Sequence, residues 1–355
     1  MRNQSYSTLA LSVVLSALGL ISSAGAEQAV ASEARLPGLR AQVLARHPKA
    51  AASSAATTFS AETSAGQTYT FTLVSFPTSL STQGVGINLG AYDDADIFGA
   101  TIHVVGTYTF PDDSSQTGFI ADVAGKTIVA ETFQALNDPT GPTPQQAYSI
   151  NDFGIVVGDY IDASGIFHSY IKTGNRFKAL DVPFAGATGT DSPAINNAGE
   201  IVGGWIDSAG TAHSYTLING NFTSFDPPGS AQGQLFYGIN NQGDITGTFA
   251  DAQGNLHGFL RHGNAFTQLD FPGAAGTFPS GINDSGVIVG GYCPTAACVT
   301  TGEGEAGFLL KDGVYTTFTI PGEPVSGLAA INNRGELMGN YVDAAGLLYT
   351  FLAVP

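Results

Sequence analysis

The sequence predicts an all-β repeat protein, and three observations carry this prediction. A phrase of the form Ile-Asn-x-x-Gly, followed by an aliphatic residue, a glycine and an aromatic residue, recurs along the chain. It begins at Ile150, Ile195, Ile239, Ile282 and Ile331. The intervals of 45, 44, 43 and 49 residues are typical of a repeat array. Only 12% of the residues are charged and 46 are glycine, a composition that suits short strands joined by tight turns.

One repeat, residues 235–272, divides into four short segments with the alternation of β-strands. Turn sequences rich in Asn, Asp, Gln and Gly separate the segments, and Gly243 can take the positive φ that such a turn needs. The predicted strands are Leu235–Ile239, Asp244–Phe249, Leu256–Leu260 and Ala265–Phe271. The repeat is therefore expected to be one antiparallel four-stranded sheet.

Equivalent positions in the second strand keep the same residue types. The glycines are Gly158, Gly203, Gly247, Gly290 and Gly339. The aromatic residues two positions later are Tyr160, Trp205, Phe249, Tyr292 and Tyr341. A glycine beside a large ring suggests a place where a neighbouring sheet approaches closely. A four-stranded sheet is too small to bury its faces alone, so the sheets are expected to stack.

The two ends of the array predict a closed six-bladed β-propeller. A degenerate unit before Ile150 contains Val105–Tyr108, and the last unit stops after three strands. The strand Phe71–Pro77 resembles the fourth strand missing at the other end and would close the last blade. An open solenoid is the alternative. The expected units lie near residues 87–133, 147–183, 192–227, 235–272, 279–321, and 328–355 with 69–77.

The N-terminal residues predict secretion. Arg2, the apolar run Leu9–Ile21 and the sequence Ala24-Gly25-Ala26 are typical of a signal peptide, expected to span residues 1–26. Residues 27–68 are rich in Ala and Ser and are expected to be a disordered linker before the propeller at 69–355. No other stretch is expected to span a membrane. The sequence does not separate the periplasm from the extracellular space.

Charge and cysteine content limit the classes of function that this chain can have. The formal net charge is −17, which disfavours binding to nucleic acid. The two cysteines, Cys293 and Cys298, lie in one loop and are expected to form a local disulfide in an oxidising compartment. A redox role is the less favoured alternative, since the loop has no Cys-x-x-Cys sequence and no nearby histidine.

The combined motifs resemble a known family. The phrases Ile-Asn-x-x-Gly, Val-Gly-x-Tyr, His-Gly-Phe and Phe-Thr-x-x-Asp-x-Pro-Gly, over about residues 69–355, are similar to the HAF-type extracellular repeats of bacteria. The resemblance implies a secreted β-propeller with no assigned activity. Some members carry a C-terminal sorting signal, which has no counterpart in this sequence. The resemblance gives no catalytic residues to transfer.

Three histidines occupy one third-strand position: His168, His213 and His257. A metal ring is one hypothesis. Three other units have Thr117, Ala306 and Tyr349 at this position, and stacked sheets lie ~10 Å apart, too far to share one ion. The histidines are therefore expected to pack between blades, beside the aromatic residues two positions later: Tyr170, Tyr215 and Phe259.

Acidic residues recur in two other patterns. The Asp-x-x-Gly series at Asp162, Asp207, Asp251 and Asp343 could suggest Ca²⁺ loops, but one carboxylate per hairpin is too few, so turns are expected. The densest acidic patches are Asp93, Asp94 and Asp96, with Asp112 and Asp113. A cation or sugar site there is an alternative to a solvated loop.

These observations predict a secreted, non-enzymatic scaffold that binds an unknown envelope polysaccharide or protein through loops over the central channel. No catalytic residue, metal or cofactor is expected, since nucleophile-elbow, zinc-protease and phosphate-loop motifs are missing from the sequence. The alternative is a propeller-type hydrolase or lyase at the channel mouth, because paired acids can be distant in sequence. A surface component without a discrete ligand is a third option. The loops expected to bind are Gln134–Gln146, Ala185–Ser192, Gly229–Gly233, Gly273–Pro279 and Cys293–Cys298.

Overall fold

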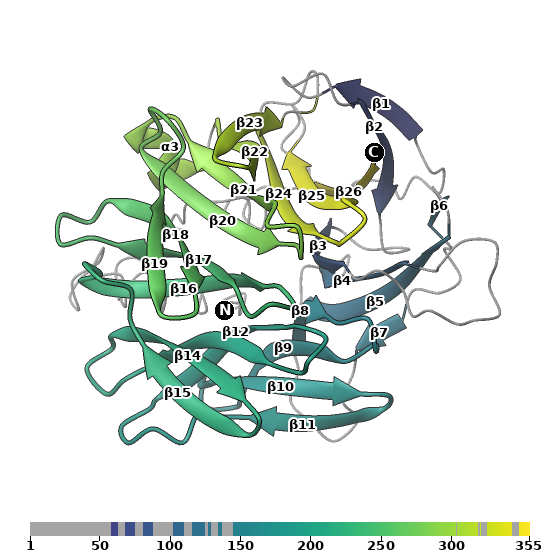
Figure 1. Ribbon diagram of the computed structural model, residues 1–355. Helices are drawn as coiled ribbons and strands as arrows, with labels where there is room; N and C mark the ends of the chain where they lie inside the picture. The colour runs from purple at the N-terminus through teal and green to yellow at the C-terminus, as the bar shows by residue number, and fades with distance from the viewer. Residues whose placement is uncertain are drawn as a thin grey trace, which may run out of the picture.

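The computed structural model confirms an all-β fold and arranges its sheets side by side around a common centre (Figure 1). It describes residues 58–62, 68–74, 81–87, 102–109, 116–124, 127–128, 134–136, 145–302, 304–318, 320, 325–342 and 348–355. The expected signal peptide and the acidic patches at residues 93–96 and 112–113 lie outside these ranges.

Four consecutive strands form each of the two sheets that follow residue 145. The strands meander, so each pairs antiparallel with the next along the chain. The first sheet contains β8 (Gln145–Ile150), β9 (Val156–Ile161), β10 (Phe167–Thr173) and β11 (Arg176–Leu180). The second contains β12 (Gly189–Ile195), β13 (Ile201–Ile206), β14 (Ala212–Ile218) and β15 (Asn221–Phe225).

An eight-stranded sheet comes next and consists of two such meanders. A single parallel bridge, Leu256 to Gly276, joins them. The first meander is β16 (Gln232–Ile239), β17 (Ile245–Ala250), β18 (Leu256–His262) and β19 (Ala265–Leu269). The second is β20 (Gly276–Ile282), β21 (Ile288–Cys293), β22 (Ala306–Lys311) and β23 (Val314–Phe318).

Chain segments from both ends share the last sheet, whose order is β1-β2-β26-β25-β24. Its strands are β24 (Val325–Ile331), β25 (Leu337–Val342), β26 (Leu348–Val354), β2 (Thr68–Val74) and β1 (Thr58–Glu62). Strand β2 pairs antiparallel with β26, as the sequence predicted for the N-terminal strand. Strand β1 lies within the segment that was expected to be a linker and adds an outer strand there.

The first repeat is irregular. It contains β3 (Ser81–Ile87), β4 (Ile102–Thr109), β5 (Gln116–Ala124), β6 (Thr127–Ile128) and β7 (Gln134–Leu136). Its core includes Ile102, Val104 and Phe119, together with Met338 and Leu352 of the last sheet. The first and last repeats therefore share one hydrophobic core.

The first strand of every repeat lies at the centre of the arrangement. The strands β3, β8, β12, β16, β20 and β24 contact one another in that order, and β24 contacts β3. Each of them has a register shift shortly before its end, for example between Ala147 and Ser149 and between Pro279 and Gly281. Such bulges bend a strand and accommodate proline. They also bring the six strand ends together.

The second-strand glycines have a different role from the one expected. The ring of Tyr215 on β14 lies over Gly203 on β13, where a Cβ would come within 2.8 Å of it. The same cross-strand pairing of a glycine with an aromatic residue occurs at Gly158 with Tyr170 and at Gly339 with Phe351. The close approach is therefore made within the same sheet, by a third-strand ring and, at Gly158 and Gly339, also by a main-chain oxygen of the first strand, and not by a neighbouring sheet.

A short helix and a disulfide lie between β21 and β22. Helix α3 spans Ala296–Thr301, and the side chain of Thr295 caps its N-terminus. Cys293 and Cys298 form a buried disulfide that ties the end of β21 to this helix. In the part of the chain that the structure describes, no helix is long and apolar enough to cross a membrane.

Candidate functional site: an axial ring of asparagines

The recurring Ile-Asn-x-x-Gly phrase forms the turn between the first and second strands of each sheet. In the turn after β8, the side-chain oxygen of Asn151 accepts hydrogen bonds from the main-chain N–H groups of Phe153 and Ile155, at 3.1 and 3.0 Å. Gly154 has φ 71°, a conformation that favours glycine. These two requirements explain why asparagine opens the turn and glycine stands three positions later.

The amide nitrogen of these asparagine side chains reaches the next repeat. The amide N–H of Asn151 donates to the main-chain carbonyl of Asn196, and the bond recurs from sheet to sheet in the same direction. The donor–acceptor pairs are Asn151–Asn196 at 3.2 Å, Asn196–Asn240 at 3.0 Å, Asn240–Asn283 at 3.3 Å and Asn283–Asn332 at 3.2 Å. All five asparagines are buried, so these four hydrogen bonds tie consecutive repeats together away from bulk solvent.

A second hydrogen-bonded ring lies one residue further along and faces the centre. It consists of Asp152, Asn197, Asn241, Asp284 and Asn333. Each of the first four donates its main-chain N–H to the side-chain oxygen of the next, at 2.7–2.9 Å. The side-chain amides donate to the two acids, from Asn197 to Asp152 at 2.6 Å, and from Asn241 and Asn333 to Asp284 at 2.7 and 2.6 Å.

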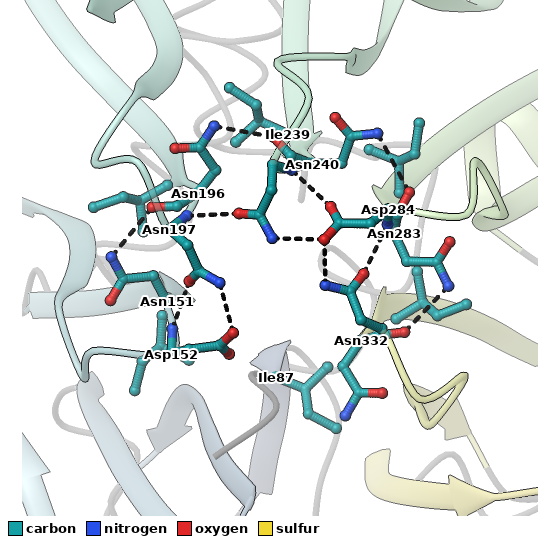
Figure 2. A pocket seen from close by; sticks show the side chains of 16 residues that line it. Ile87, Asn151, Asp152, Asn196, Asn197, Ile239, Asn240, Asn283, Asp284 and Asn332 are labelled. Atoms are coloured by element: carbon teal, nitrogen blue, oxygen red, sulfur yellow. Dashed lines mark hydrogen bonds between the residues drawn. The ribbon is translucent and has the colours of Figure 1, made fainter. Parts of the chain in front are cut away.

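These residues surround a pocket on the axis of the molecule (Figure 2). Its cavity volume is about 70 Å³, well below the ~300–1,000 Å³ that is typical of drug-sized sites. The wall is formed by the carboxamides and the two carboxylates. The isoleucines that end the first strands also line it: Ile87, Ile150, Ile195, Ile239, Ile282 and Ile331. Little of their apolar surface faces the pocket, whose lining is mainly polar.

The two carboxylates give the pocket a negative charge. Asp152 and Asp284 lie on different sides of the opening, and each accepts an amide N–H of the ring (Figure 2). Among the described residues, no group of three or more His, Cys, Asp or Glu is placed to hold a metal ion. The ring can therefore present fixed hydrogen-bond donors and acceptors, but not a site made of several protein carboxylates.

The pocket lies at the opposite end of the first strands from the loops predicted to bind. Four of the five predicted loops lead into β8, β12, β16 and β20, and the fifth, Cys293–Cys298, begins beside the start of β20. The pocket lies where these strands end. The sequence contained the signal for the pocket, because the residue after each motif asparagine is Asp or Asn in all five phrases. The phrase was interpreted only as a turn, since a sequence does not show that turns 43 to 49 residues apart meet on one axis.

The three aligned histidines are held within their own sheets. His257 lies between two carboxylates, with Nδ1 2.8 Å from Asp270 and Nε2 3.4 Å from Asp251. His168 lies between Asp181 and Asp162, and His213 between Asp226 and Asp207, in the same way. Their rings pack on Phe249, Tyr160 and Trp205. The prediction placed them between blades beside Tyr170, Tyr215 and Phe259. The partners that the structure gives them are these carboxylates and rings of their own sheets.

The described Asp-x-x-Gly sequences form turns, as predicted. In the hairpin after β17, Oδ1 of Asp251 accepts the main-chain N–H groups of Gln253 and Asn255, and Gly254 has φ 83°. The side-chain amide of Asn255 also donates to this carboxylate. This bond, the largest contribution, and the main-chain N–H groups lower the pKa of Asp251 to about 2. The equivalent turns at Asp162 and Asp207 have the same main-chain bonds. Asp343 lies outside the described residues.

One buried acid was not anticipated. Glu305, just before β22, is 6% exposed and its carboxyl lies over Gly291. Its Oε2 atom has no hydrogen-bond partner among the described residues. Burial raises the pKa of Glu305 to about 8, so the group is mostly protonated at neutral pH. Glu305 does not line the axial pocket.

The sequence matches no protein-family model and none of the curated proteins. Several solved structures resemble this chain in backbone arrangement, with low sequence identity. A fungal lectin from Aleuria aurantia, described as a six-bladed β-propeller with a fucose recognition mode, has a TM-score of 0.47 and 11% identity over 79% of this chain and 98% of its own. A gluconolactonase from Xanthomonas campestris has a TM-score of 0.42 and 10% identity over 81% and 90%. A Trypanosoma rangeli sialidase has a TM-score of 0.49 and 9% identity over 84% of this chain and 56% of its own. Binding proteins and enzymes both occur among them, and the similarity selects neither.

Proposed function

We propose that the chain forms a closed, six-bladed β-propeller. The eight-stranded sheet would count as two blades, because a single bridge joins its two meanders. Closure is supported by the pairing of β2 with β26 and by the core that Phe119 shares with Leu352. The ring would then need no free sheet edge at the junction between the two ends of the chain.

We also propose that the protein is secreted and belongs with the HAF-type repeats. The leader-like residues 1–26 and the repeated phrases support this assignment. The disulfide between Cys293 and Cys298 supports it independently, since such bonds persist mainly in oxidising compartments.

Its function, in this proposal, is to bind a small hydrophilic ligand in the axial pocket without chemical conversion. One observation carries the proposal: side chains from five repeats converge on one pocket with their hydrogen-bonding groups already fixed by their neighbours. Groups held in place lose little conformational entropy when a ligand arrives, so the affinity per contact is high.

Catalysis is not favoured by the same geometry. A hydrolase usually pairs an acid of raised pKa with a second carboxylate at the substrate. The acid with such a pKa, Glu305, lies away from the pocket, and the pocket acids Asp152 and Asp284 are engaged with ring amides. Among the described residues, Glu305 and the pocket acids therefore do not form such a pair at the axial pocket.

A thermal-shift screen tests the proposed function. The mature protein would be heated with neutral and charged glycans, envelope polysaccharide, Ca²⁺, Zn²⁺ and EDTA, because ligands of the native state raise the melting temperature. The proposal predicts a saturable rise with at least one compound, lost in Asn333→Ala and kept in Asn255→Ala. The control removes an exposed amide bonded to Asp251 in a hairpin outside the pocket. A rise that survives Asn333→Ala would contradict binding in the pocket.

A further inference from the structure

We infer that each of the three aligned histidines, together with the aspartate that opens its hairpin, binds one Zn²⁺ ion. The pairs are His168 with Asp162, His213 with Asp207 and His257 with Asp251. Each pair lies within one sheet, so the three ions are separate and need no site shared between sheets that lie ~10 Å apart. The inference goes beyond the proposed function, because these pairs do not line the axial pocket.

In each pair, a ring nitrogen and a carboxylate oxygen have the separation of two ligands of one zinc ion. The Nε2 atom lies 3.5 Å from Oδ2 of the aspartate at His168, and 3.4 Å at His213 and His257. These distances exceed the ~2.7–3.2 Å of an ordinary N–H···O hydrogen bond. Zn–N and Zn–O bonds are about 2.0–2.2 Å long, and at a tetrahedral angle they hold their ligand atoms about 3.4 Å apart.

The other ring nitrogen is held as it is in zinc sites. The carboxylates at Nδ1 belong to Asp181, Asp226 and Asp270, at 2.9, 3.2 and 2.8 Å. A metal-binding histidine donates its second N–H to such a carboxylate, which fixes the tautomer and the orientation of the ring. With the proton on Nδ1, the lone pair of Nε2 faces the oxygen of the hairpin aspartate. The two electron pairs repel, so a cation between them is favoured, and a proton and a zinc ion compete for this position.

The hairpin turn fixes the orientation of the aspartate. Oδ1 of Asp207 accepts the main-chain N–H groups of Ala209 and Thr211, both at 2.8 Å. Because Oδ1 takes both main-chain bonds, Oδ2 is the oxygen that faces the histidine. The bond from Thr211, more than any other interaction, lowers the pKa of Asp207, so the carboxylate is charged at neutral pH. The turn at Asp162 has the same main-chain bonds.

Solvent can complete the coordination of each ion. The side chains of the three pairs are between 21% and 32% exposed. Zinc in proteins is usually four-coordinate, so two protein ligands leave two positions for water. Among the described residues, no group of three metal-ligating side chains surrounds one point. With half the ligands of a structural zinc site, each pair should have a dissociation constant on the order of 10–100 µM.

The ligand types select zinc over the common hard cations. Imidazole nitrogen is a good ligand for Zn²⁺, whereas Ca²⁺ and Mg²⁺ are bound by oxygen ligands. Each hairpin offers one carboxylate oxygen beside one ring nitrogen, which is too few oxygens for Ca²⁺. We therefore expect no saturable binding of CaCl₂ or MgCl₂ at these pairs.

Titration of the intact protein with ZnCl₂ tests the inference at one pair and at all three. Calorimetry should give three ions per chain, one for each pair. Trp205, the only tryptophan of the sequence, stacks on the ring of His213 at 4.6 Å between ring centroids. Its fluorescence therefore reports the pair in that sheet, and it should change and saturate over the same range of zinc concentration.

Variants separate the ligands from the carboxylate behind the ring. His213→Gln and Asp207→Asn should each reduce the number of ions by one and abolish the change in Trp205 fluorescence, and the asparagine keeps an oxygen for the turn. Asp226→Asn keeps both ligands and should weaken this pair about 10–100-fold, the usual effect of removing such a carboxylate. His262→Gln is the control, because that side chain is 79% exposed and pairs with one carboxylate. It should bind as many ions as the wild type.

Several outcomes would overturn the inference. These are no heat and no fluorescence change at about 1 mM ZnCl₂, well above the expected dissociation constant, an equal response to CaCl₂, or an ion count that His213→Gln leaves unchanged. Asn333→Ala, in the axial pocket, should bind zinc as the wild type does. Loss of zinc binding in that variant would place the ion in the pocket, which contradicts the inference and leaves the proposed function intact. Melting curves of all variants, measured without zinc, show that each one is folded.

Discussion

The side-chain amide of Asn283 donates to the main-chain carbonyl of Asn332, 49 residues later and in the next repeat, at 3.2 Å. The same side chain accepts the N–H groups of Ser285 and Val287 with its oxygen. One residue therefore shapes its own turn with one atom and ties that turn to the neighbouring repeat with another. Four repeats in succession use their motif asparagine in this way.

The substitution Asn283→Asp separates these two roles. The aspartate keeps an oxygen for the turn but places a second oxygen against the carbonyl of Asn332, where the amide donated. Because Asn283 is 5% exposed, the loss of this bond and the unpaired charge should lower the free energy of unfolding by about 1–3 kcal/mol. Urea denaturation measures the change.

Asn221→Asp is the matched control. Its amide also donates to a main-chain carbonyl, that of Asn219, but the residue is exposed and the bond stays within its own turn. Its effect should be within about 0.5 kcal/mol of zero. An equal loss of stability in the two variants would contradict the role assigned to the inter-repeat bond.

Removal of strand β2 should have a larger effect than removal of β1. Tyr69 and Phe71 on β2 pack in one core with Phe318 and Phe351, and β2 pairs with β26. A variant that begins at residue 63 lacks only β1, while one that begins at residue 75 lacks both strands. The first should melt cooperatively, and the second should lose its cooperative transition. In the intact chain, Phe71→Ala should cost about 3–5 kcal/mol. Circular dichroism melting compares them, and similar curves for the two truncations would refute the closing role of β2.

Glu305 should make stability depend on pH between about 4.5 and 8. Burial raises the pKa of its carboxyl to about 8 in the folded protein, against about 4.5 when exposed. The folded state therefore favours the protonated form. The contribution of this pKa difference to the free energy of unfolding is complete below pH 4.5 and is lost as the pH rises through about 8.

Glu305→Gln should remove this dependence, since glutamine stays neutral. The variant should exceed the wild type in stability at pH 9 and not at pH 4, by a difference on the order of a few kcal/mol. Urea midpoints at pH 4, 7 and 9 measure it. Parallel loss of stability in both proteins between pH 7 and 9 would assign the dependence to another group.

His257, like Glu305, should stabilise the folded state more at low pH than at high pH. Burial lowers its pKa, but the hydrogen bonds and charges of Asp270 and Asp251 outweigh burial, so the pKa is raised above 6.5. Its contribution is therefore complete below pH 6.5 and is lost as the pH rises through the raised pKa. The facing groups are Asp251 and Asp270, with the Tyr315 hydroxyl near Asp270.

NMR titration of the imidazole signals measures this shift directly. His257→Gln should lower stability more at pH 5.5 than at pH 8.5. His262→Gln is the control, because that side chain is 79% exposed and pairs with one carboxylate. A pKa of His257 at or below 6.5 would contradict the two-carboxylate arrangement.

The sequence predicted the repeated unit well because short-range chemistry determines it. Asn240 and Gly243 specify a turn through local bonds, and alternation along Ile245–Ala250 specifies a strand. The pairing of β2 with β26 was also predicted, because an unfinished last repeat and an unmatched first strand complement each other. The acidic partners of the three histidines were not predicted, because Asp270 and Asp251 lie 13 and 6 residues from His257, and only the folded hairpins show which ring atoms they meet.

The axial pocket could not be predicted from local patterns. Asp152 and Asn197 are 45 residues apart, and Asn241 and Asn333 meet on Asp284 only when the sheets surround one axis. Glu305 shows the same limit, since its raised pKa depends on its burial over Gly291. Convergence on an axis is a property of the assembled sheets and of no single repeat.

Ligand binding in the axial pocket is tested most directly by NMR of the side-chain amides of the ring. The ¹H–¹⁵N signals of Asn197, Asn241 and Asn333 would be assigned by single substitution and recorded during titration with a compound that raises the melting temperature in the thermal-shift screen. These three signals should shift together and saturate with one dissociation constant, while the signal of Asn255 should not move. Signals of the ring that stay fixed while other residues shift would contradict binding in the axial pocket.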